Sequence, residues 1–265
     1  MDKLDGLPSV HCITLKESVD RRQNLLKWFD EYGVPSYTIN VFDRNIDLSQ
    51  YAFVGKYSDR IPETERKIFI SHFSTLRRWY ESTNEPCLIV FEDDVSFETV
   101  QYWNFSWKQF HESIPESCKC IQLSLIRYKC EPYEFAPREP LRRGHWSACA
   151  YFMKREYVKH LLEIYNPVSN SFLLEIQDTD MYPDLESILF LDIKKRVYVF
   201  PLFLEDCYVL GSTFSKSENP HRYMSHDCVL NWWKEFGKDL NLKDMMDLTN
   251  IIHREISHEI RCGYR

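Results

Sequence analysis

Three carboxylates follow one another at Glu92, Asp93 and Asp94, directly after the apolar run 87–91. The run Cys-Leu-Ile-Val-Phe predicts a buried strand. Carboxylates at the end of such a strand repel one another and resist burial unless a cation or strong hydrogen-bond donors compensate them. Ligands of open α/β sheets bind at the carboxyl ends of strands, and hard carboxylate oxygens suit Mg²⁺ or Mn²⁺. Two interpretations follow: a divalent metal that carries phosphate oxygens, or a solvated acidic turn that caps the next helix.

The composition limits how this chain could bind phosphate. Among 265 residues there are only 7 glycines, and neither G-x-G-x-x-G nor G-x-x-x-x-G-K-[ST] occurs. Any phosphate site must therefore use a metal and basic side chains. The formal net charge of −7 argues against free nucleic acid as a partner, because phosphate-driven binding needs a basic face.

Cysteine usage and the N-terminus bear on the compartment. The nine cysteines are scattered and odd in number, which favours buried free thiols in a reducing compartment over a disulfide framework. The first residues lack the apolar core of a signal peptide, and no apolar run approaches membrane-spanning length. We expect a cytoplasmic protein without a membrane-spanning segment.

Apolar periodicity predicts strands and helices in alternation along the chain. This order indicates an α/β fold with a Rossmann-like, mainly parallel central sheet flanked by helices. No linker or internal repeat is present, so a single domain over 1–265 with a helical tail at about 227–265 is the simplest organisation. The expected strands are 10–15, 36–42, 87–91, 121–126 and 147–153, and the expected helices are 19–32, 63–82, 154–165, 182–191, 227–236 and 244–260.

A pair of motifs resembles glycosyltransferase family 25, the group that contains lipopolysaccharide glycosyltransferases and collagen galactosyltransferases. One is Ser71-His72 within the helical segment 67–79, and the other is the strand end Leu88-Ile-Val-Phe-Glu-Asp-Asp-Val95. Weaker matches extend the resemblance over about residues 10–215, although Thr14 stands where the family usually has Asn. Those weaker matches are Ile13-Thr14-Leu15 with Asp20-Arg21-Arg22, Val41-Phe42-Asp43, 144–151, Tyr182-Pro183-Asp184, Pro201-Leu-Phe203 and Ser212-Thr213.

The resemblance implies a GT-A fold and a nucleotide-sugar donor, taken here as a UDP-sugar. It also implies transfer to a hydroxyl of a glycan or other acceptor, with inversion at the sugar carbon. The cytoplasmic character favours a glycan pathway of a microbe or a virus-infected host cell. The expected donor-binding residues are Thr14, Leu15, Arg21, Arg22, Asp43, Ser71, His72, Glu92 and Asp93.

The acidic strand end suits the leaving group of such a reaction. A metal that bridges the two phosphates stabilises their developing charge as a Lewis acid. Glu92 and Asp94 point to the same side of an extended strand, so one can bind the metal while the other reaches the ribose or a coordinated water. We expect Asp94 to be the main ligand of Mn²⁺ or Mg²⁺, supported by Glu92 or Asp93, although the spacing of the three acids does not decide this division. His221 is a further candidate ligand. Arg21 and Arg22 would face phosphate oxygens, or lie as charges on an exposed helix surface.

An inverting transfer needs a general base for the acceptor hydroxyl. The second acidic segment, 175–186, supplies Asp184, which the family match favours, and its rival Asp180. A helix cap is an equal alternative for Asp184, because Asp is favourable at a helix N-terminus. Two other functions stay open: a metal-dependent phosphohydrolase that uses the same carboxylates, and a non-catalytic sugar-binding module of the same fold.

Overall fold

The computed structural model describes residues 2–126, 135–138, 146–176, 182–192, 194, 196–208 and 220–246. Its helices are α1 (Val19–Tyr32), α2 (Glu63–Ser82), α3 (Trp107–Ser113), α4 (Arg155–Tyr165), α5 (Leu185–Phe190), α6 (Pro220–Phe236) and α7 (Leu242–Met246). Its strands are β1 (Val10–Leu15), β2 (Tyr37–Phe42), β3 (Ala52–Val54), β4 (Cys87–Glu92), β5 (Val95–Ser96), β6 (Cys120–Gln122), β7 (Ala136–Pro137), β8 (Ala150–Lys154), β9 (Ser171–Leu173), β10 (Val197–Val199) and β11 (Leu204–Glu205).

The central sheet has the strand order β2-β1-β4-β8-β6-β10-β7. Strands β2, β1 and β4 are parallel neighbours, and β6 is parallel to β10. Strand β8 lies between β4 and β6 and runs antiparallel to both, as β7 does to β10. The predicted α/β class with a mainly parallel sheet is therefore confirmed, with β8 as an antiparallel strand near the middle.

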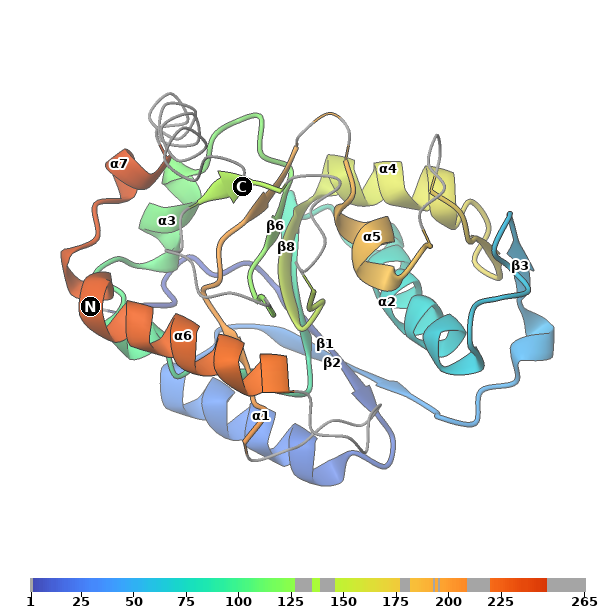
Figure 1. The fold of residues 1–265 in the computed structure, drawn as a ribbon, viewed down its shortest axis with the longest axis horizontal. Coiled ribbons are helices and arrows are strands. Elements are labelled where there is room, and N and C mark those ends of the chain that lie inside the picture. The colour runs from blue at the N-terminus through green and yellow to red at the C-terminus, as the bar shows by residue number, and fades with distance from the viewer. Residues whose placement is uncertain are drawn as a thin grey trace, which may run out of the picture.

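Helices cover both faces of this sheet. Figure 1 shows α2, α4 and α5 on one side, and α1, α3 and α6 on the other. Alternate strand residues serve the two faces: Ile89 and Phe91 join the core under α1, α3 and α6, whereas Leu88 and Val90 join the core under α2, α4 and α5. The run 87–91 is apolar throughout because both of its faces are buried.

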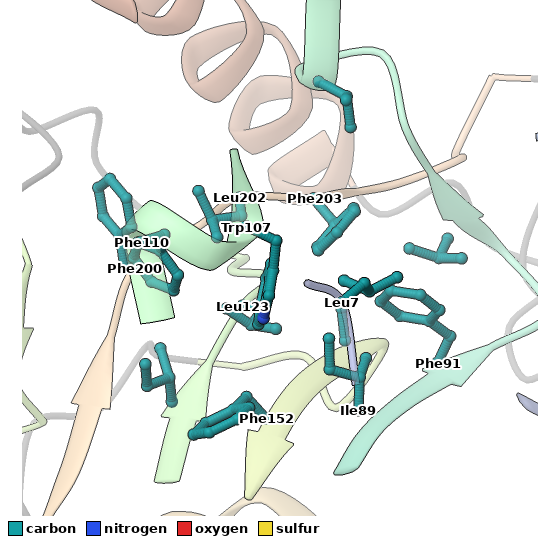
Figure 2. Packing of buried hydrophobic residues seen from close by; sticks show 14 of the residues in the cluster. Leu7, Ile89, Phe91, Trp107, Phe110, Leu123, Phe152, Phe200, Leu202 and Phe203 are labelled. Atoms are coloured by element: carbon teal, nitrogen blue, oxygen red, sulfur yellow. The ribbon is translucent and has the colours of Figure 1, made fainter. Parts of the chain in front are cut away.

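Aromatic rings fill the core on the side of α3 and α6. The rings of Phe91 and Phe203 lie 4.9 Å apart at an edge-to-face angle, and Trp107 packs 6.2 Å from Phe152 (Figure 2). Edge-to-face contacts of this kind add to the burial energy of each ring. This packing anchors β4 and the segment 200–204, which carry acidic side chains at their ends.

Several predicted boundaries differ from the structure. Helix α2 has the predicted bounds, whereas α5 and β6 are shorter than expected. Helix α6 begins at Pro220 rather than at residue 227 as expected, so His221 lies in its first turn. Helix α7 covers the start of the expected helix 244–260, and residues 247–265 lie outside the described residues.

The cysteines are mostly as expected. Six described cysteines are free and buried, at positions 12, 87, 118, 120, 149 and 207. Cys228 on α6 is disulfide-bonded, so the expectation of free thiols is wrong for this position. An odd cysteine count excludes a complete pairing but does not exclude a single disulfide.

Candidate functional site

A cavity of about 640 Å³ opens at the carboxyl ends of β1, β2 and β4. The register places these ends together, since Leu15 pairs with Phe42 and Ile13 pairs with Glu92. The parallel strands therefore deliver their last residues to one edge of the sheet. Most of the residues predicted to bind donor or metal line this cavity: Thr14, Leu15, Arg21, Asp43, Ser71, His72, Glu92, Asp93 and Asp94.

Arg21 compensates the charge of the acidic strand end. From α1, its Nη1 donates to Oδ1 of Asp93 at 2.9 Å and contacts Oδ2 of Asp94 at 3.2 Å. The hydroxyl of Thr14 donates to the other oxygen of Asp93 at 2.6 Å. Asp93 and Asp94 lie in a turn but are buried, which contradicts a solvated acidic turn for these two residues. The cause is tertiary: α1 packs its first turn against the end of β4.

A second arginine reaches the same carboxylates from the opposite part of the chain. On α6, Nε of Arg222 donates to Oε2 of Glu205 at 2.7 Å, and its Nη2 lies 3.6 Å from Oδ2 of Asp94. Glu205 ends β11, which pairs with β5 next to the acidic tripeptide. Neither residue was predicted. The run Leu-Phe-Leu ahead of Glu205-Asp206 repeats the pattern of an apolar strand with an acidic end and could have identified Glu205; no sequence signal distinguishes Arg222.

The uncharged ring of His72 contacts both Tyr151 and Glu92. Its Nδ1 lies 2.9 Å from the hydroxyl of Tyr151, and its Nε2 lies 3.0 Å from Oε1 of Glu92. Burial lowers the pKa of His72 to about 3, so the ring is neutral near pH 7 and cannot serve as a base of ordinary strength. A neutral ring has one donor and one acceptor nitrogen, which suits the hydroxyl on one side and the carboxylate on the other.

The carboxylates of the cavity lack sufficient positive charge. Burial, together with the charges of Asp94 and Asp93, raises the pKa of Glu92 well above its usual range. Burial and Asp94 likewise raise the pKa of Glu205, although Arg222 opposes the rise. Carboxyl groups that resist ionisation in this way lie where an added cation would be stabilised.

The structure also tests whether the site suits a divalent metal. Oδ1 of Asp94 is buried and accepts no hydrogen bond, so it is an oxygen available to a hard cation. Within the described ranges no three His, Cys, Asp or Glu side chains are grouped as a ready metal site. Mg²⁺ and Mn²⁺ commonly take one or two carboxylates and complete their shell with water and substrate phosphates, so the residues present fit such an ion.

Three predicted residues are not brought to the cavity by the described part of the chain. Arg22 does not line it; its guanidinium donates to the carbonyl oxygens of Leu15 and Lys16 and thereby fixes the turn after β1. His221 lies in the first turn of α6 and is not among the lining residues. Asp180 lies outside the described residues.

The second acidic segment contributes Asp184 and Glu186 to the cavity wall. Asp184 is the N-cap of α5, where its Oδ1 accepts a hydrogen bond from the backbone N–H of Ser187 at 2.7 Å. The cap interpretation of Asp184 is therefore confirmed. Glu186 was not predicted as a site residue, although it lies in the same acidic segment.

Comparisons with known proteins give structural neighbours only. No family model matches the chain, and no curated protein matches it. A glycosyltransferase involved in the glycosylation of the major capsid of PBCV-1 aligns at 10% identity and a TM-score of 0.40, over 73% of this chain and 82% of that one. A197 from STIV aligns at 15% identity and a TM-score of 0.37, over 75% and 84%. Mouse xyloside xylosyltransferase 1 aligns at 10% identity and a TM-score of 0.31, over 75% and 76%.

All three TM-scores are below 0.5, so we infer the function from the site itself. Membership of glycosyltransferase family 25 stays a prediction from the motifs. None of the described helices is both long and apolar enough to cross a membrane.

Proposed function

We propose that this protein is a GT-A glycosyltransferase that transfers a sugar from a UDP-sugar to a hydroxyl of a glycan or other acceptor, with inversion. The observation that carries the proposal is the cavity at the ends of β1, β2 and β4. There the acidic tripeptide Glu92-Asp93-Asp94 lies between two arginines, and a separate pair of carboxylates lines the wall at α5. This arrangement provides one place for a diphosphate with its cation and another for an acceptor with its base.

The arginines suit the leaving diphosphate. Arg21 and Arg222 both reach the cavity, and a guanidinium matches phosphate oxygens with paired N–H donors. Both guanidinium groups are held in place by Asp93, Asp94 and Glu205. Preorganised positive charge of this kind stabilises the negative charge that develops as the sugar–phosphate bond breaks.

A divalent cation would be held by Asp94, with Glu92 in support, because Asp93 already accepts hydrogen bonds from Thr14 and Arg21. When bound, Mn²⁺ or Mg²⁺ supplies Lewis-acid stabilisation of the diphosphate. Thr14 keeps Asp93 in place through its hydroxyl. His72 keeps Glu92 in place, since its ring is fixed by Tyr151 on the other side.

The proposal is tested with a panel of UDP-sugars in the presence and absence of Mn²⁺. We expect one donor to raise the melting temperature only with the metal, and UDP to be released slowly when water is the acceptor. Metal-dependent binding without any release would instead indicate a non-catalytic sugar-binding module. Hydrolysis of p-nitrophenyl phosphate without any response to UDP-sugars would indicate a phosphohydrolase, and either result would refute the proposed transferase.

A further inference from the structure

Glu186 lies in the cavity wall, where backbone N–H groups hold its carboxylate. It is the second residue of α5, and its Oε1 accepts a hydrogen bond from the backbone N–H of Ser147 at 3.2 Å. The carboxylate also accepts a hydrogen bond from the backbone N–H of Glu186 itself, and the side chain lines the cavity. Backbone donors fix the position of this carboxylate at the cavity wall, and a proton acceptor needs such a fixed position.

Ser147 holds Glu186 from a strained backbone conformation. Its φ is +96°, the only positive φ of a non-glycine residue in the described part of the chain. Such conformations cost free energy and persist where the surrounding contacts enforce them. The Oγ of Ser147 donates to Oε1 of Glu205 at 2.8 Å, and Glu205 in turn holds Arg222. Ser147 thus connects the carboxylate on α5 to the arginine beside Asp94.

Two other titratable residues act electrostatically on Glu186 or lie under its field. Asp184 is likewise held through one oxygen, because its Oδ1 caps α5, and it is the rival that the variants below separate from Glu186. His72 is kept neutral with both ring nitrogens engaged, and its pKa is lowered to about 3 by burial. Burial raises the pKa of Glu186 to about 7, and the charge of Asp184 adds to the rise. A base with a pKa near the working pH combines ionisation with basicity.

We infer that Glu186 is the general base that accepts the proton of the acceptor hydroxyl, and that Ser147 is its positioning residue. This inference rests on the proposed transferase function. The acceptor oxygen forms a bond to the anomeric carbon while the bond from that carbon to the phosphate oxygen breaks. UDP leaves with the bonding electron pair, and the hydroxyl proton passes to the carboxylate of Glu186.

The test compares Glu186→Gln and Glu186→Ala with the wild type and with Glu163→Gln, an exposed carboxylate on α4. Calorimetry with the UDP-sugar and Mn²⁺ measures donor binding, and UDP release with water as acceptor measures turnover. We expect both Glu186 variants to bind donor within about 2-fold of the wild type and to release UDP about 10²- to 10⁴-fold more slowly. Glu163→Gln should match the wild type in both measurements.

Azide separates a base from a structural residue. It is a nucleophile that needs no deprotonation, so it should restore UDP release by Glu186→Ala and yield a glycosyl azide. It should leave Glu163→Gln unchanged. A residue that only supports the fold would not be rescued in this way.

The pH profile provides a second readout. The groups that influence Glu186 are Asp184 on its own segment, Glu92 on β4, His72 on α2 and Arg138 after β7. We expect the wild-type rate to fall below about pH 7 as Glu186 is protonated. Asp184→Asn removes a neighbouring negative charge and should move this limb to lower pH.

The outcomes distinguish the two levels of inference. If the wild type neither binds a UDP-sugar nor releases UDP, the proposed function fails and the assignment of Glu186 fails with it. If the wild type turns over and Glu186→Gln retains more than a tenth of that rate, the transferase stands and Glu186 is not the base. Loss of turnover in Asp184→Asn with rescue by azide in an Asp184→Ala variant would assign the base to Asp184.

Discussion

Replacing Arg21 tests whether its positive charge stabilises the buried carboxylates Asp93 and Asp94 in the folded protein. Its side chain is 9% exposed and faces Asp93 and Asp94, whose side chains are 8% and 9% exposed. Glutamine in its place keeps a polar group but removes the positive charge. Two buried carboxylates would then depend on Thr14 and the more distant Arg222.

The expected loss follows from the burial of these groups. Removing one partner of a buried ion pair costs about 3–5 kcal/mol because an uncompensated charge remains. This corresponds to a roughly 160- to 5,000-fold larger unfolding equilibrium constant. Urea denaturation at pH 7 without added metal measures the change, provided that the m-value is unaltered.

Arg44→Gln is the matched control. Arg44 also pairs with a carboxylate, that of Glu17 at 2.6 Å, but the two side chains are 53% and 45% exposed. Such a pair contributes about 0–1 kcal/mol, so the control should lose little stability. The double variant Arg21→Gln with Asp93→Asn should recover part of the loss, because it removes one of the unpaired charges. A loss in Arg21→Gln as small as that in Arg44→Gln, or no recovery in the double variant, would refute this electrostatic reasoning.

Three further predictions use the same cavity and its surroundings. Asp94→Ala should abolish Mn²⁺-dependent donor binding in calorimetry and leave the circular dichroism spectrum of the protein unchanged. Asp30→Ala, at an exposed carboxylate, is the control, and donor binding retained by Asp94→Ala would contradict the metal assignment. Ser147→Ala should lower the free energy of unfolding by about 1–3 kcal/mol, because Glu205 loses a buried hydrogen-bond donor. The control Ser113→Ala should lower it much less, and equal losses would argue against the role of Ser147 in connecting Glu186 to Glu205. Burial lowers the pKa of His226, but the hydrogen bonds and charges of Glu98 and Asp227 outweigh it and raise that pKa above 6.5. The stabilisation by protonated His226 is complete below the pKa that His226 has in the unfolded chain, and it is lost as the pH rises through the pKa of His226 in the folded protein. His226→Asn should therefore lower the free energy of unfolding more at pH 6 than at pH 8 in urea denaturation. Equal losses at the two pH values would contradict this reasoning.

The sequence was sufficient to predict the elements that form the floor of the site. Helix α2 has its apolar residues at helical spacing, and the run 87–91 is apolar because both of its faces are covered. The alternation of strands and helices then predicted a mainly parallel sheet. These properties depend on residues close together in the chain, so they can be read without knowing which elements become neighbours.

The sequence left open the surroundings of two acidic sites, which the fold now shows. The tripeptide 92–94 could have been a solvated turn, but α1 brings Arg21 onto it and removes it from water. Asp184 was an equal candidate for a base and for a cap; its contact with Ser187 establishes the cap, and this contact does not test the role of base. In both cases the sequence identified the acidic residue, but it did not show which residue would contact it.

The sequence by itself determined where the acidic strand end lies, which helices flank it, and that phosphate binding cannot use a glycine-rich loop. Tertiary structure alone brought Arg222 and Glu205 beside Asp94, inserted β8 between β4 and β6, and set Ser147 against Glu186. The physical reason is that periodicity and apolar runs are local properties of the chain. Charge compensation and pKa depend on desolvation and on partners that only the packed fold brings within a few ångströms.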